Sequence, residues 1–339
     1  MSKRLGKQTV AFQNPPWVAA GACVVGKKEG EGPLAEWFDV ISQDSYFGEK
    51  SWEKAESTML RQCFALCCDK AKTAPSDLQG IFAGDLLNQC VSSNFAARDT
   101  GVPFFGLYGA CSTMAEGLTL AAMALDGGFA ETVCAMTSSH FCSAERQYRL
   151  PLEYGGQRTP TSQWTVTGAG ALILKNGGGS GAHITHATAG RIVDAGITDM
   201  NNMGAAMAPA ALDTLTAHFA DTGRSPQSYD AVITGDLGQH GHNVLMELFR
   251  QEGLEFSRIF TDCGVLIYSP EQDTHCGGSG CGCSASMLAG YILHQITEGE
   301  WNRVLFAATG ALMSPTTAMQ GETIPAICHA VAIENMREV

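Results

Sequence analysis

Residues 109–128 read GACSTMAEGLTLAAMALDGG, and residues 280–299 read GCGCSASMLAGYILHQITEG. Each stretch opens with small residues, cysteine and serine, and continues as a long, largely apolar pattern that ends near glycine. A helix with small or apolar residues on nearly all of its faces is buried on nearly all sides. We therefore expect two equivalent buried helices that pack against each other, one in each half of the chain.

The same repetition extends to the segments around these helices. Residues 75–86 (PSDLQGIFAGDL) match residues 226–237 (PQSYDAVITGDL), and both end in a short apolar strand followed by Gly-Asp-Leu. Residues 128–139 (GFAETVCAMTSS) match residues 299–311 (GEWNRVLFAATGA) in the same way. Three matched blocks in the same order indicate an internal duplication. Helix and strand alternate in each half, which favours a layered α/β architecture with crossover connections.

The boundary between the halves is expected at the glycine-rich turn 176–181 (NGGGSG), interpreted as a flexible linker. The N-terminal half, residues 1–178, then carries Cys111, and residues 179–339 form the C-terminal half.

Composition excludes several classes of partner. The formal net charge is −13, which argues against a nucleic-acid partner, because phosphate binding needs a basic surface. Only 16% of the residues are charged, so much of the surface is expected to be buried in a homodimer. The N-terminus lacks a secretion signal and no apolar run reaches a membrane-spanning length of ~18 residues, so the thirteen cysteines are expected to be reduced and mostly buried.

Cys111 stands at the start of the first buried helix, where free N–H groups are expected to lower its thiol pKa. Such a thiol is a good nucleophile, but the same geometry binds a carboxylate equally well. Cys111 alone therefore leaves catalysis and binding both open. Thr113 and Glu116 fit a T-x-x-E capping box in the first turn.

Three motifs carry a resemblance to the thiolase and ketoacyl-synthase superfamily. GACST at 109–113 is similar to its nucleophile motif, and TVTGAGALIL at 165–174 resembles the glycine-containing strand that closes its first half. ATGALMSP at 308–315 resembles the closing glycine loop of its second half. The resemblance implies a thiolase-like five-layer αβαβα fold with two halves related by a pseudo-twofold axis.

Within that superfamily the chain resembles the stage V sporulation protein AD family of endospore-forming bacteria. The matching segments are GDLLNQ (84–89), TSSH (137–140), AERQYR (144–149), EYGGQ (153–157) and GGSGCGCSA (277–285). The resemblance implies binding of dipicolinic acid (pyridine-2,6-dicarboxylate) as it enters developing spores and leaves at germination. It also implies a peripheral place at the spore inner membrane after synthesis in the cytoplasm. The expected partners are the membrane subunits of the SpoVA complex, to which this family belongs, and calcium that accompanies the ligand.

The catalytic partners of a condensing enzyme are missing from their expected places. Such enzymes pair the cysteine with histidine, and with histidine or asparagine, in the second half. The turn 234–237 (TGDL) holds no histidine, and the segment 277–283 holds neither residue. His240 and His242 follow in a glycine-containing loop and are expected to face solvent. Carbon–carbon bond formation is therefore not expected. Residual acyl transfer to Cys111 is the alternative to ligand binding, and a purely scaffolding role is a third hypothesis.

A planar dicarboxylate needs cationic or N–H donors at both ends. Arg146 and Arg149 are three residues apart and are expected on one face of a helix, where pairing with a nearby glutamate is the alternative. His140 follows a strand, at the end where open α/β sheets bind ligands. Asp85 and Asp236 occupy equivalent strand ends. We favour the interpretation that they cap loops; the alternatives are that they contact arginine or bind calcium.

The two helix starts are expected to face one pocket because of the pseudo-twofold axis. The candidate ligand-binding residues are Cys111, Ser112, Thr113, His140, Arg146, Arg149, Asp85, Asp236, Ser279, Gly280 and Cys281. Neither a cofactor nor a metal site is predicted, since no cysteine pair has the C-x2-C spacing of a zinc knuckle. Met203 and Met207 are interpreted as packing residues.

Overall fold

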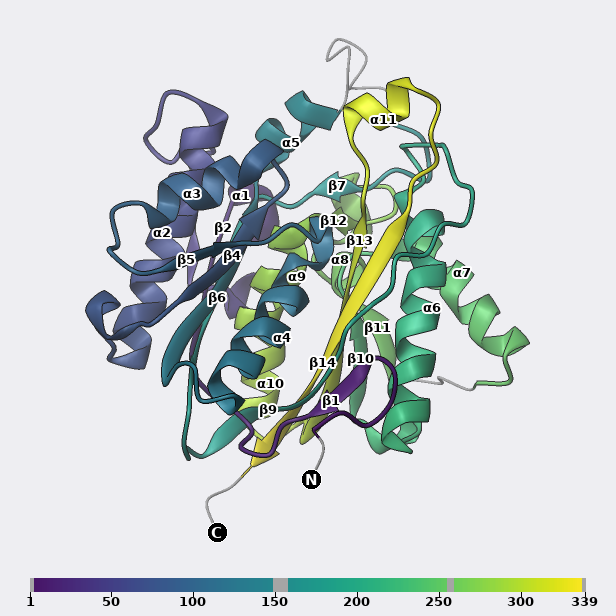
Figure 1. The fold of residues 1–339 in the computed structure, drawn as a ribbon. Helices are drawn as coiled ribbons and strands as arrows, with labels where there is room; N and C mark the ends of the chain where they lie inside the picture. The colour runs from purple at the N-terminus through teal and green to yellow at the C-terminus, as the bar shows by residue number, and fades with distance from the viewer. Residues whose placement is uncertain (1–2, 149–157, 255–258, 337–339) are drawn as a thin grey trace.

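The computed structural model describes residues 3–148, 158–254 and 259–336. Its elements form five layers, which run from left to right in Figure 1 as helices, sheet, helices, sheet, helices. The outer helices are α2 (Trp52–Ala71) and α3 (Val91–Ala97) on one side and α6 (Met203–Thr222) and α7 (Gly238–Gln251) on the other. The central layer contains α4 (Thr113–Asp126), α9 (Cys281–Met287) and α10 (Leu293–Thr297).

Each half contributes five strands in the same order, which confirms the predicted duplication. The first sheet runs β5-β4-β6-β8-β2, and the second runs β11-β10-β13-β14-β9. The strands of the first are β2 (Trp17–Val25), β4 (Ile81–Asp85), β5 (Phe104–Gly106), β6 (Thr132–Ser139) and β8 (Gly168–Lys175). Those of the second are β9 (Gly181–Thr188), β10 (Ala231–Thr234), β11 (Phe260–Asp262), β13 (Arg303–Ala311) and β14 (Ala326–Met336). A single residue pair, Trp17 with His183, joins the two sheets.

The remaining elements are short. The strands β1 (Thr9–Ala11) and β3 (Val40–Ile41) pair with β9 and β2, and β7 (Trp164–Thr165) pairs with β12 (Gly278–Ser279). The short helices are α1 (Lys27–Gly30), α5 (Phe141–Tyr148), α8 (Cys263–Leu266) and α11 (Pro315–Met319). One turn of π-helix (Leu288–Ile292) lies between α9 and α10.

Small residues let the central helices approach both sheets closely. A Cβ atom on Gly170 of β8 would stand 2.3 Å from the carbonyl oxygen of Ala285 on α9, so only glycine fits there. On α4, Leu118 is fully buried between the sheets. The central layer is thus the hydrophobic core of the molecule. All thirteen cysteines are free thiols and eleven of them are buried, as predicted.

The glycine-rich seam is a short connection between the two sheets. Residues 176–180 connect β8 directly to β9. A Cβ atom on Gly179 would stand 2.3 Å from the indole ring of Trp17, which packs against this turn. The first residue of β2 therefore holds the junction between the halves in place.

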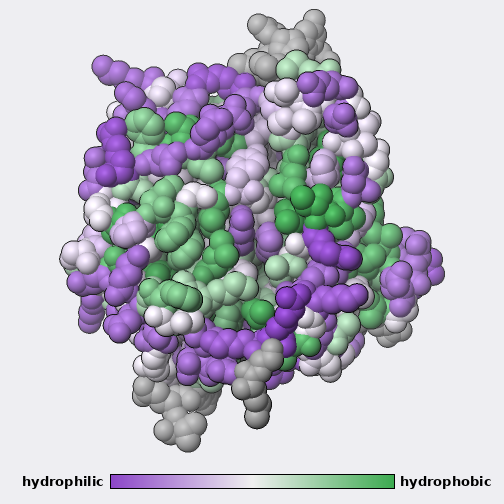
Figure 2. Space-filling view, viewed as in Figure 1, coloured by the Kyte–Doolittle hydropathy of each residue, from purple (hydrophilic) through white to green (hydrophobic). Residues whose placement is uncertain are grey.

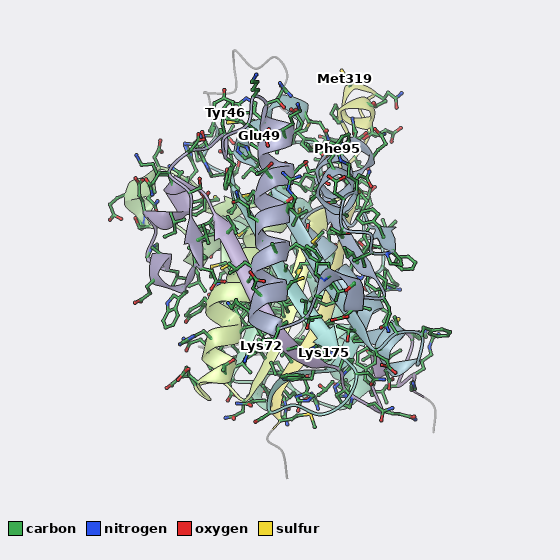
Figure 3. The ribbon with its side chains drawn as sticks, turned by 90° about the vertical axis from the view of Figure 1, so that its left-hand side faces the viewer. Tyr46, Glu49, Lys72, Phe95, Lys175 and Met319 are labelled. Carbon is green, nitrogen blue, oxygen red and sulfur yellow. The ribbon has the colours of Figure 1, made fainter. Side chains whose placement is uncertain are left out.

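Figure 3 shows the outer face of the first half, where α2 runs the height of the molecule from near Glu49 to Lys72. The buried side of α2 packs on β2 and β8 through residues such as Met59 and Cys63. Among the described residues, no helix combines the length and the apolar character needed to cross a membrane.

The central layer gives a stability prediction. Leu118→Ala should lower the free energy of unfolding by about 2–5 kcal/mol, because it leaves a cavity between two sheets that cannot collapse. Ile192→Ala is the control, since Ile192 is 66% exposed and lies away from α4, and it should cost less than about 1 kcal/mol. Urea unfolding followed by circular dichroism measures both, and equal losses would contradict the assignment of α4 to the core.

Candidate functional site

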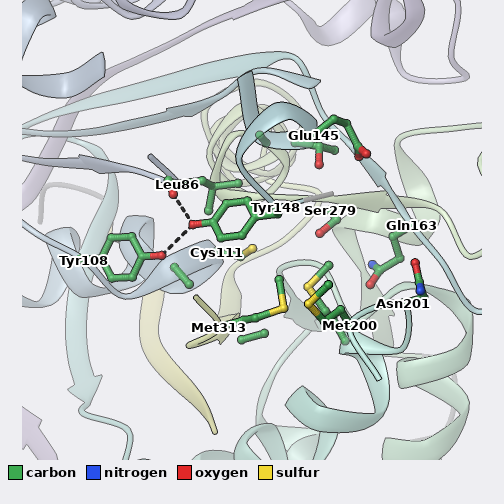
Figure 4. Close-up of a pocket in the computed structure, with 15 residues that line it drawn as sticks. Leu86, Tyr108, Cys111, Glu145, Tyr148, Gln163, Met200, Asn201, Ser279 and Met313 are labelled. Atoms are coloured by element: carbon green, nitrogen blue, oxygen red, sulfur yellow. Dashed lines mark hydrogen bonds between the residues drawn. The ribbon is translucent and has the colours of Figure 1, made fainter. Parts of the chain in front are cut away.

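A pocket opens at the carboxyl ends of β4 and β13, where the two halves meet (Figure 4). Its walls come from both halves: the turn before α4, helix α5, strands β7 and β12, the segment that leads into α6, and the end of β13. The free space is small, about 70 Å³. Ligands of open α/β sheets bind at this end of the strands, so the pocket is the candidate site.

Aromatic rings and thioethers face each other across this space. Tyr148 hydrogen bonds through its hydroxyl to the carbonyl oxygen of Leu86, and the hydroxyls of Tyr108 and Tyr148 lie 3.0 Å apart. Below Tyr148 in Figure 4 lie Met200 and Met313, and Met203 lines the same wall. Methionine sulfur makes favourable contacts with aromatic rings. The pocket, called the slot below, is therefore bordered by aromatic rings and by thioethers.

Cys111 lies at the floor of the slot, in a strained turn. The preceding residue, Ala110, has a φ of 49°, which is uncommon for a residue with a side chain. The end of β13 presses against this turn, because a Cβ atom on Gly310 would stand 2.2 Å from the carbonyl oxygen of Gly109. Both halves thus fix the position of Cys111.

Asp236 lies beneath Cys111 and controls its chemistry. Its carboxylate accepts hydrogen bonds from the Gly280 amide (2.9 Å), the Thr309 hydroxyl (2.9 Å) and the Ser279 hydroxyl (3.2 Å). Burial and the charge of Asp236 raise the thiol pKa of Cys111 well above its ordinary value. The expectation that the helix start lowers this pKa was wrong, since α4 begins two residues later and burial dominates.

The pocket is acidic. None of its described lining residues is lysine, arginine or histidine, and Glu145 of α5 is among them. Burial also raises the pKa of Asp236. Burial and the charge of Asp236 raise the pKa of the neighbouring Asp262 to about 7, although the hydrogen bonds of Asp262 oppose the shift. Among the described lining residues, a bare dianion would meet no positively charged side chain.

Ser112 and Thr113 are buried, and their hydroxyls donate to the carbonyl oxygens of Gly109 and Ala110 within their own turn. They shape the floor of the pocket and do not line it. The predicted capping box is absent, because Ser112 precedes the helix and a buried carboxylate oxygen of Glu116 has no hydrogen-bond partner.

Two of the predicted cationic residues lie elsewhere. Arg146 points away from the pocket and forms an ion pair with Glu53 of α2. His140 is buried beside Trp52, where its Nε2 lies 2.8 Å from the carbonyl oxygen of Ser45, and burial lowers its pKa. Helix α5 faces the pocket with Ala144 and Tyr148 instead. Arg149 lies outside the described residues.

Asp85 caps a loop, the favoured of its three interpretations. Its carboxylate accepts hydrogen bonds from the amides of Leu87 and Ser93 (2.9 and 2.8 Å) and from the Ser93 hydroxyl. Burial raises the pKa of Asp85, although these hydrogen bonds oppose the shift. Burial and the charge of Asp85 raise the pKa of Glu56 to about 8. Cys281 is buried next to Cys111 and donates to the carbonyl oxygen of Ser138.

The second-half histidines lie on a helix and not in a loop. His240 and His242 belong to the first turns of α7, and the His242 ring stacks on Phe260. Neither lines the pocket. No group of three or more His, Cys, Asp or Glu side chains among the described residues is arranged to hold a metal ion.

Sequence reasoning missed most of the walls of the pocket. Met203, interpreted as a packing residue, lines it together with Met200, Asn201 and Met313. Tyr108 and Tyr148 were also missed, although Tyr108 directly precedes the GACST motif and Tyr148 lies inside AERQYR. Their positions next to recognised motifs were the available signal.

A family model described as Stage V sporulation protein AD (SpoVAD) matches residues 6–334. The chain belongs to this family. Stage V sporulation protein AD of Bacillus subtilis (strain 168) is 44% identical over 332 residues, which cover 98% of both chains. The match spans every element that builds the pocket.

Solved structures show that the SpoVAD-family chain has a thiolase-like fold, as predicted. It is similar to 3-oxoacyl-(acyl carrier protein) synthase III from Xanthomonas oryzae (TM-score 0.63, 13% identity, 96% of this chain and 100% of that one). A similar match is the Acat5 thiolase from Ascaris suum in complex with coenzyme A (TM-score 0.60, 9% identity, 95% and 100% coverage). At these identities the likeness concerns the fold alone.

The raised thiol pKa can be tested by alkylation. At pH 7.5, iodoacetamide should modify Cys111 more than about tenfold more slowly than the partly exposed Cys276, because each pKa unit lowers the thiolate fraction about tenfold. Asp236→Asn should speed the modification of Cys111, since it removes the neighbouring negative charge. Peptide mass spectrometry gives both rates.

Asp99→Asn is the control, because Asp99 is an exposed surface residue, and it should change neither rate. Wild-type labelling of Cys111 as fast as that of Cys276 would contradict the role given to Asp236.

Proposed function

We propose that this SpoVAD-family protein is a non-enzymatic subunit that binds dipicolinate in the slot above Cys111. The observation that carries the proposal is the slot itself, in which Tyr148 and three methionines face each other across a space that suits one flat ring. The hydroxyls of Tyr108 and Tyr148 form a hydrogen-bonded polar pair at one end of the slot. Membership of the family supports the choice of pyridine-2,6-dicarboxylate among flat aromatic acids.

The ligand enters as its calcium complex. Dipicolinate is a dianion, and the lining offers Glu145 and no described cationic side chain. Buried Asp236 adds a further acidic group below the floor. A calcium ion held by the ligand neutralises the charge of the dianion, so the described lining need not supply a cation.

Residual acyl transfer to Cys111 is less well supported. A nucleophilic cysteine needs a lowered pKa or an adjacent base. The Cys111 thiol has a raised pKa, because it is buried and lies near the carboxylate of Asp236. The slot is also small for a long acyl chain.

In the cell, the protein is proposed to act with other SpoVA membrane subunits as a peripheral protein of the spore inner membrane. There it passes dipicolinate inward during sporulation and outward at germination. Family membership supports this placement.

Calorimetric titration of the purified protein with dipicolinate tests the binding proposal. Binding should be tighter with calcium than with a chelator, and Tyr148→Leu should weaken it about tenfold because it removes the aromatic ring that faces the methionines. Cys111→Phe should abolish it by filling the slot. Arg146→Ala is the control and should bind normally, since Arg146 pairs with Glu53 away from the slot. An absence of heat at millimolar ligand, with and without calcium, would refute the proposal.

A second copy of the chain is the proposed partner at the edge strand β5. The Ile81 amide donates to the Pro103 carbonyl oxygen and the Leu107 amide donates to that of Ala83, so the alternate residues Phe104 and Gly106 direct their backbone groups away from the sheet. Figure 2 shows apolar side chains gathered left of centre over β5 and α4. The large exposed apolar residues near this edge are Phe95, Phe105, Leu120, Met123 and Phe129.

Phe105→Lys should convert the dimer to a monomer, because it places a charge on an apolar edge strand. Light scattering after size exclusion measures the mass. Met319→Lys on α11 is the control, since Met319 is also exposed (78%) and α11 lies away from β5 in Figure 1, and it should leave the dimer intact. A wild-type protein that elutes with the mass of one chain would exclude this interface.

A further inference from the structure

The two sheets separate immediately after the residue pair that joins them. On one side, β2 pairs with β8 along its whole length. On the other side it pairs only at its ends, where Trp17 pairs with His183 of β9 and Val24 and Val25 pair with β3. The middle of β2 therefore has an edge that no strand covers.

A groove of about 470 Å³ lies along this edge. Its floor is the helix that continues from α9, with Ala289 and Gly290 in the π-helical turn and Leu293 on α10. Trp17 and Trp37 stand at its sides. The groove shares no lining residue with the slot above Cys111, so it is a separate feature of the surface.

The backbone of β2 leaves hydrogen-bonding groups open in this groove. The Cys23 amide points away from β8 and is satisfied by the Asp39 carboxylate (3.0 Å), and the outward carbonyl oxygen of Val25 accepts from the Ser42 amide (2.8 Å). In an antiparallel ladder, outward-facing residues recur every second position, so Gly21 directs both its N–H and its C=O into the groove. Among the described residues, neither group of Gly21 has a partner.

The groove has an aromatic side and an acidic rim. The Trp37 ring packs on His294, with ring centroids 4.3 Å apart, so the indole is held in place. The charge of Asp39 is balanced by Lys70, whose Nζ lies 2.9 Å from the Asp39 Oδ1. Glu36 is exposed and has no ion-pair partner in the described part of the chain. The net charge of the groove is therefore negative.

We propose that this groove binds an extended peptide segment of another protein. The segment adds a short strand beside β2 and pairs with Gly21, the mode in which main-chain hydrogen bonds give affinity and side-chain pockets give specificity. Its apolar side chains lie against Trp17 and Trp37, and a lysine or arginine lies near Glu36. An open N–H and C=O on one strand residue suit a peptide backbone better than a compact molecule.

A library of random eight-residue peptides displayed on phage provides the probe. Selection on the full-length protein, followed by calorimetry with the best synthetic peptides, should give sequences with apolar residues and at least one lysine or arginine. Trp37→Ala should weaken their binding about tenfold or more, as expected for an aromatic anchor. Glu36→Lys should weaken it severalfold, and more at low salt, because Glu36 is exposed and its charge is screened by salt.

Glu322→Lys, at an exposed position before β14, is the matched control and should bind the peptides normally. Hydrogen exchange gives a second measurement that needs no variant. The Gly21 amide should exchange faster than those of Ala20 and Ala22 in the free protein and slow when peptide binds. The proposal would be overturned if no peptide binds at 1 mM, or if Trp37→Ala and Glu36→Lys bind the peptides as tightly as the wild-type protein. It would also be overturned if bound peptide protects backbone amides from exchange only outside β2.

Discussion

The burial of α4 and α9 between two sheets is the constraint on which the rest of the structure depends. A helix enclosed on all sides can carry only small or apolar residues, and it must start and end where the sheets allow its polar ends to be satisfied. The duplication places the N-terminal ends of both central helices at the carboxyl ends of the parallel strands. The slot, its cysteine and its buried aspartate lie there because it is the place where backbone donors from both halves converge.

The chemistry of the slot follows from the same burial. In a low-dielectric interior a charged group is costly unless it is paired, and the described lining contains no cation. Asp236 is stabilised instead by an amide and two hydroxyls. Its charge lies close enough to Cys111 to disfavour the thiolate. The motif that resembles a nucleophile site has kept its geometry, while its electrostatics favour the protonated form of the cysteine.

The sequence was sufficient for the fold because the fold depends on local patterns that occur twice. The matched blocks at 75–86 and 226–237 are enough to infer the layers, and GACST is enough to place Cys111 at a helix start. The site was predicted less well, because its walls come from segments far apart in the sequence. Arg146 and Tyr148 are two residues apart on α5, and only the packing of that helix against α2 decides which of them faces the slot. The thiol pKa of Cys111 likewise depends on Asp236, 125 positions away in the sequence.

One continuous helical segment connects the two clefts of the molecule. It begins at Cys281 beside the slot, passes through the π-helical turn at Leu288–Ile292, and ends beside the groove at Leu293 and His294. The π-helical turn places Ala289 and Gly290 on the floor of the groove, and Gly290 can lie there because a larger residue would meet the carbonyl oxygen of Trp37 at 2.7 Å. At one end of this segment the two halves meet and enclose the slot. At the other end they separate, and the groove lies along the open edge of β2. Both clefts are thus consequences of joining two copies of one unit through a single strand contact.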